Sequence, residues 1–174
     1  MKKIFLLLLS AIVLSACEGD QGPPGLNGID GVNVVAQSYE IQGTFSAPDY
    51  RFIVDHPIEV FETDMVLVYL SWDSVNAGDG LPTDVWRLLP QSIYSDFGEF
   101  SYNYESTFEY VDIFMDGPLS TDFSLLSPAD TDNQRFRVVI LPVDLASDPN
   151  LDVTNYDQVM QVAGLSSSDI ITIE

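Results

Sequence analysis

Apolar and polar side chains alternate with a period of two through much of residues 34–174, and this alternation constrains the fold more than any other feature. In residues 39–45 the apolar side chains occupy odd positions, and Phe100, Tyr102 and Tyr104 repeat the pattern. Such alternation is typical of a β-strand with one buried face. Residues 65–70 are apolar at consecutive positions, which predicts a strand covered on both faces.

Residues 108–115, 136–141 and 169–174 are further expected strands, separated by turn-forming Asp, Asn, Gly and Pro. One helix is expected near the C-terminus, because apolar side chains recur there at the spacing of one helical face: Tyr156, Val159, Met160 and Ala163. Thr154 is its expected N-cap, and Gly164 stands where the helix should end. The pattern predicts a mainly β fold, a single β-sandwich domain over residues 34–174, immunoglobulin-like or jelly-roll-like, with one short helix near the C-terminus.

Residues 1–16 have the features of a secretion signal. Lys2 and Lys3 precede an apolar run over residues 4–14, which is shorter than the roughly 20 residues that a membrane span requires. Residues 14–17, Leu-Ser-Ala-Cys, cover the end of this signal and the residue after it, and they resemble a bacterial lipobox. That resemblance implies that Cys17 is acylated and that the acyl chains anchor the protein to a membrane.

Glycine recurs at every third position after Cys17, at Gly19, Gly22, Gly25, Gly28 and Gly31. This is the period of collagen, but five triplets with two prolines are few for a triple helix. Residues 17–33 are therefore interpreted as the lipidated Cys followed by an extended tether, and the chain is expected to be a monomer. A short trimerising stem is the alternative.

The signal, the lipobox and the Gly-x-y run, together with the segments at residues 84–90, 100–104 and 111–116, resemble the small collagen-like lipoproteins of Bacteroidetes-type bacteria. The resemblance implies a location at the outer membrane, on the periplasmic side or at the cell surface. It implies no activity, because the function of that family is uncharacterised. Ser74, within Asp-Ser-Val, also resembles the O-glycosylation acceptor of such bacteria.

The charge balance excludes several classes of function. The chain has 27 Asp and Glu against 6 Lys and Arg, a net charge of -21, which argues against binding to nucleic acids or to anionic lipid surfaces. It has one His, His56, and one Cys, and it lacks the common catalytic motifs. We therefore expect a non-enzymatic protein, with a hydrolase that uses a carboxylate pair as the remaining catalytic alternative.

Calcium and glycans are the ligands that the composition favours. Asp148, Asn150 and Asp152 alternate as in the start of a calcium loop, and Asp130 and Asp132 form a second acidic loop. No other cofactor is expected. Trp72, Trp86 and the tyrosines offer rings for a glycan, while Arg135 and Arg137, on one face of a strand, are expected to form ion pairs or to bind an anion. The sequence thus predicts a lipid-anchored interaction or structural protein with an unknown protein or glycan partner; the alternative is a glycan- or Ca²⁺-binding module of a surface system.

Overall fold

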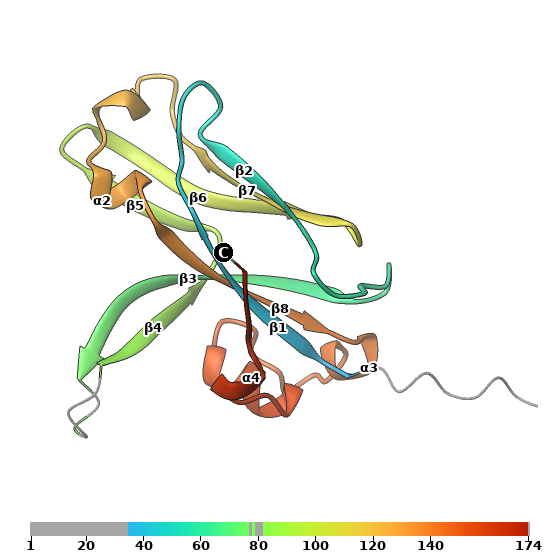
Figure 1. Cartoon of the computed structure of the whole chain (residues 1–174). Coiled ribbons are helices and arrows are strands. Elements are labelled where there is room, and N and C mark those ends of the chain that lie inside the picture. The colour runs from blue at the N-terminus through green and yellow to red at the C-terminus, as the bar shows by residue number, and fades with distance from the viewer. Residues whose placement is uncertain (1–34, 77, 79–81, 174) are drawn as a thin grey trace, which may run out of the picture. The chain divides into compact units, whose positions relative to one another are not determined.

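The computed structural model describes residues 35–76, 78 and 82–173 of the 174-residue chain. These residues form two β-sheets that pack face to face (Figure 1), which confirms the predicted β-sandwich. The predicted signal peptide, Cys17 and the Gly-x-y tether lie outside the described residues. Within the described part of the chain, every helix is too short or too polar to cross a bilayer.

The first sheet, which we call sheet A, has five strands in the order β4-β3-β8-β1-β9. Its neighbouring strands are antiparallel except for β1 and β9, which run parallel. The strands are β1 (Gln37–Gly43), β3 (Met65–Asn76), β4 (Pro82–Leu88), β8 (Gln134–Leu141) and β9 (Ile171–Ile173).

The second sheet, sheet B, has four antiparallel strands in the order β2-β7-β6-β5. These are β2 (Arg51–Asp55), β5 (Gln91–Ser95), β6 (Gly98–Ser106) and β7 (Tyr110–Asp116). Four shorter elements lie in the connections. These are η2 (Phe123–Leu125) and α2 (Pro128–Thr131) between β7 and β8, and α3 (Val143–Ala146) and η3 (Ser167–Asp169) between β8 and β9.

The main core lies between the sheets and is formed by the alternating side chains that the sequence predicts. Tyr39 and Ile41 enter it from β1, and Phe100 and Tyr102 enter it from β6. Gly43, at the end of β1, leaves space for the ring of Phe52, because a Cβ atom on this residue would collide with that ring.

A second core lies on the outer face of sheet A, beneath α4 (Tyr156–Ala163), on the side away from sheet B (Figure 1). Leu67 and Tyr69 of β3 contribute to this core, whereas Val68 and Leu70 face sheet B. The strand that is apolar at consecutive positions is thus buried on both faces, as predicted. Tyr69 also donates a hydrogen bond to the carbonyl of Val153 at 2.7 Å, which ties the strand to the segment before α4.

Helix α4 begins one residue later than the sequence predicts. Asn155 is the N-cap, because its side chain accepts a hydrogen bond from the backbone of Gln158. Thr154 instead donates its hydroxyl and its backbone N–H to Asp152. The predicted end is confirmed, since Gly164 has a φ of 68°, a left-handed conformation that favours glycine.

Candidate functional site

Arginine side chains form a network of ion pairs on the part of the outer face of sheet A that lies beside α4. Glu40 of β1 is opposite Arg137 of β8 in the strand register, and their charged atoms are 2.6 Å apart. Arg135 contacts Glu40 at 3.3 Å and Asp84 of β4 at 2.7 Å. The hydrogen bond to Asp84 is the main cause of the raised pKa of Arg135. The positive charges of Arg135 and Arg137 are therefore neutralised by the carboxylates of Glu40 and Asp84.

Two aromatic side chains enclose the guanidinium group of Arg137. It lies 4.0 Å from the ring centroid of Trp86 and donates a hydrogen bond of 2.5 Å to the hydroxyl of Tyr156. The side chain of Arg137 is only 12% exposed, and its Nε atom is buried without a hydrogen-bond partner. Burial raises the pKa of Tyr156, and Arg137 partly offsets this rise, so the phenol keeps its proton at neutral pH.

A cavity of about 410 Å³, which we call the Trp86 pocket, opens beside this network. Its walls combine the rings of Trp86 and Tyr156 with carboxylates, hydroxyls and aliphatic side chains. The lining residues are Pro82, Thr83, Asp84, Trp86, Arg137, Tyr156, Asp157, Met160, Leu165, Ser166 and Ser167. The volume falls within the range of roughly 300–1,000 Å³ that is usual for small-molecule sites.

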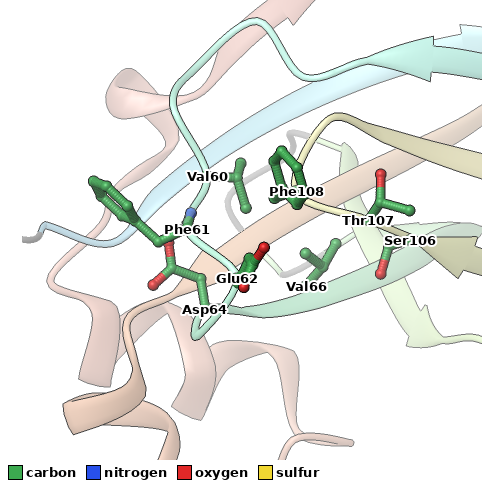
Figure 2. A pocket seen from close by; sticks show the side chains of 8 residues that line it. All are labelled: Val60, Phe61, Glu62, Asp64, Val66, Ser106, Thr107 and Phe108. Carbon is green, nitrogen blue, oxygen red and sulfur yellow. Dashed lines mark hydrogen bonds between the residues drawn. The ribbon is translucent and has the colours of Figure 1, made fainter.

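A second cavity, of about 320 Å³, lies where the β2–β3 connection meets the β6–β7 turn (Figure 2). We call it the Phe108 pocket. It is lined by Val60, Phe61, Glu62, Asp64, Val66, Ser106, Thr107 and Phe108. Sequence reasoning missed this cavity, because its residues come from separate connections and form no local motif.

The predicted ion pairs of Arg135 and Arg137 are thus present. Because Glu40 and Asp84 already neutralise these arginines, their predicted role in binding an anion has little support. Each tryptophan lies against a guanidinium group, Trp86 against Arg137 and Trp72 against Arg87 at 3.8 Å. Of the two rings, only Trp86 lines one of the cavities described above.

In the acidic loops predicted to bind calcium, the carboxylates accept hydrogen bonds from neighbouring residues of the same loop. Asp148 accepts hydrogen bonds from the backbone and the side chain of Asn150, and Asp152 accepts two from Thr154. Asp130 and Asp132 accept hydroxyl hydrogen bonds from Ser127 and Thr131. Over residues 35–76, 78 and 82–173, no three His, Cys, Asp or Glu side chains gather in a group that could hold a metal ion.

The remaining predicted position, Ser74, lies in β3, which continues to Asn76. Its exposed position on the β3–β4 hairpin leaves it open to a modifying enzyme.

No family model, curated protein sequence or solved structure matches the chain. Its function is therefore inferred from its own residues and geometry.

Proposed function

We propose that this chain is a lipid-anchored, non-enzymatic binding protein of the outer membrane, whose β-sandwich domain holds a neutral glycan in the Trp86 pocket. The observation that carries the proposal is the arrangement of Trp86, Tyr156 and Arg137, which places aromatic surface beside fixed hydrogen-bonding groups in one cavity.

A sugar ring presents apolar C–H groups on its faces and hydroxyl groups around its edge. Trp86 and Tyr156 supply apolar surface for such a face, and their ring centroids lie 5.8 Å apart. Asp157, Ser166 and Ser167 supply acceptors and donors for hydroxyl groups. Tyr156 accepts a hydrogen bond from Arg137, so its own proton is available to donate to a ligand.

The charge distribution favours a neutral ligand over an anionic one. Arg135 and Arg137 are already paired with Glu40 and Asp84. Asp157, which forms no ion pair within the described part of the chain, adds a negative charge to the wall of the pocket. The chain as a whole carries a charge of -21, which repels uronic acids, phosphates and sulfates.

The proposed location rests on Cys17 and the tether that follows it. A Cys17→Ala substitution should prevent lipidation and move the protein from the membrane fraction to the soluble fraction after cell lysis. Val13→Ile, a conservative change in the apolar run that leaves residues 14–17 intact, serves as the matched control. Unchanged membrane association of Cys17→Ala would contradict the lipid anchor.

The glycan proposal can be tested on the full chain in a detergent without a sugar head group, with tryptophan fluorescence as the readout. Trp72→Phe leaves Trp86 as the only tryptophan. We expect saturable changes in its emission with neutral mono- and disaccharides and none with uronic acids. Tyr156→Phe in this background should weaken binding about fivefold, because it removes a hydrogen bond worth about 1 kcal/mol.

Tyr94→Phe is the matched control, because Tyr94 is 79% exposed and lies outside the pocket. Equal weakening by the Tyr94 and Tyr156 substitutions would contradict the assignment of the site. A fluorescence response that remained in Trp86→Phe, with Trp72 as the reporter, would place the ligand elsewhere.

A further inference from the structure

We propose that the Phe108 pocket binds the side chain of a lysine or an arginine presented by a partner protein. The inference rests on the juxtaposition of Glu62 and Asp64 with the apolar walls formed by Val60, Val66 and Phe108. It does not depend on the glycan proposal, which concerns the outer face of sheet A.

Both sheets and both connections contribute to this cavity. Val66 comes from β3 of sheet A, Ser106 ends β6 of sheet B, and the β2–β3 connection supplies the two carboxylates. In Figure 2 the side chains of Val60 and Phe108 lie close together with the carboxylate of Glu62 beside them, whereas the ring of Phe61 points outward. A ligand in the cavity would therefore meet aliphatic, aromatic and acidic groups together.

The two carboxylates have no counter-charge within the part of the chain that the structure describes. The ion pairs there involve Arg51, Arg135 and Arg137, and none includes Glu62 or Asp64. The fourth arginine, Arg87, stacks on Trp72. Since residues 4–174 contain no lysine and no further arginine, a cation that occupies this cavity comes from outside the described chain.

The apolar walls indicate what kind of cation fits. Phe108 is 48% exposed and does not belong to the core between the sheets, so the face of its ring is available to a ligand. Lysine and arginine carry an aliphatic stem that packs on apolar surface and a charged end that remains near polar groups. A phenyl ring also attracts such a cation through its face. A bare metal ion would make no use of these walls, and an anion would be repelled.

Hydrogen bonds within the two connections hold the entrance of the cavity in place without a ligand. The backbone N–H of Phe61 donates to Asp64 Oδ2 at 3.0 Å, and the N–H of Asp64 donates to the carbonyl of Phe61 at 2.9 Å. On the opposite side, the carbonyl of Thr107 accepts a hydrogen bond from His56 Nε2 at 2.9 Å. A preformed site avoids part of the entropy lost on binding, so a single side chain can be recognised without refolding of the loops.

The test uses the full chain in a zwitterionic detergent and an acetylated, amidated pentapeptide with one central lysine between glycine and serine flanks. Binding is measured by NMR, through the methyl signals of Val60 and Val66. We expect saturable shifts, at least tenfold weaker binding when norleucine replaces the lysine, and weaker binding as NaCl is added. Glu62→Gln should weaken binding about threefold, as for an exposed ion pair, and Phe108→Ala should weaken it further.

Glu59→Gln is the matched control, because it removes one exposed negative charge from the same connection without changing the lining. Equal weakening by Glu59→Gln and Glu62→Gln would overturn the proposal, since it would attribute the attraction to overall charge alone. Equal binding of the norleucine peptide would also overturn it. Neither result would bear on the Trp86 pocket, which is monitored through Trp86 fluorescence.

Discussion

The hydroxyl of Tyr39 lies 2.8 Å from Nδ1 of His56. Nε2 of the same imidazole is 2.9 Å from the carbonyl of Thr107, which can only accept a hydrogen bond, so Nε2 carries the proton. In the tautomer that carries only this proton, Nδ1 accepts the hydrogen bond from the Tyr39 hydroxyl. The ring of His56 therefore connects β1 of sheet A to the β6–β7 turn of sheet B, which gives the only histidine of the chain a structural role.

His56→Ala removes both hydrogen bonds and leaves the buried Tyr39 hydroxyl without its acceptor. We expect the free energy of unfolding to fall by about 2 kcal/mol, measured by urea denaturation followed by circular dichroism. Tyr39→Phe and the double variant complete a thermodynamic cycle, in which the coupling energy should be about 1 kcal/mol. Fully additive effects would contradict a direct bond between these residues.

Arg137→Ala should be one of the most destabilising arginine substitutions. It removes a cation that is 12% exposed and leaves Glu40, which is 17% exposed, with only the longer contact to Arg135. Breaking such a nearly buried pair costs about 3 kcal/mol. Arg87→Ala is the control, because Arg87 is exposed and stacks on Trp72, and its loss should cost less than about 1 kcal/mol. Similar melting temperatures for the two variants would contradict this ranking.

Alkaline pH should destabilise the fold through its buried tyrosines. Burial raises the pKa of Tyr39, Tyr69 and Tyr102 above the ordinary value of 10.0. Their contribution to stability is fully present below the unfolded pKa of about 10 and is lost as the pH rises through the higher folded pKa, because the unfolded state then releases protons that the folded state retains. We expect a constant free energy of unfolding up to about pH 9 and a decline above about pH 10.

The decline in the free energy of unfolding at alkaline pH should be shallower in Tyr69→Phe, because this substitution removes one of the buried phenols. Tyr94→Phe should retain the full slope, because Tyr94 is 79% exposed. Identical slopes in the two variants would show that the loss of stability arises from other groups.

Calcium and magnesium should stabilise the protein equally at matched ionic strength. The carboxylates of Asp148, Asp152, Asp130 and Asp132 accept hydrogen bonds within the chain, so divalent ions should act mainly by screening the charge of -21. We expect small, non-saturating increases in Tm with both ions. A saturating rise with Ca²⁺ alone would contradict this expectation, and Asp148→Asn would then test whether that loop holds the ion.

The fold was predictable because its strands carry strong local patterns. The apolar run at residues 65–70 predicts a strand that is buried on both faces. The alternation around Phe100 and Tyr102 predicts a strand that is buried on one face. The helix start was less predictable, since Thr154 and Asn155 are both good N-caps and the difference lies in the hydrogen bonds of Asp152 and Gln158.

The candidate sites were harder to predict because they depend on strand register. Glu40 and Arg137 are 97 positions apart, and only the pairing of β1 with β8 brings them together. The sequence predicted ion pairs for Arg137 but did not identify the partner. Glu62 and Phe108 carry no motif at all, and they meet only because two connections lie at the same place in the fold.

The positions of the arginines make the folded domain resistant to trypsin-like proteases. Trypsin-like enzymes cut after lysine or arginine when the side chain can enter a deep pocket and the backbone can extend. Residues 4–174 contain only four such side chains, and all four lie against aromatic rings. Each is also in a paired strand, β2, β4 or β8. The folded domain therefore offers trypsin no ready cleavage site, and limited digestion with trypsin should leave it intact for as long as the sandwich stays closed.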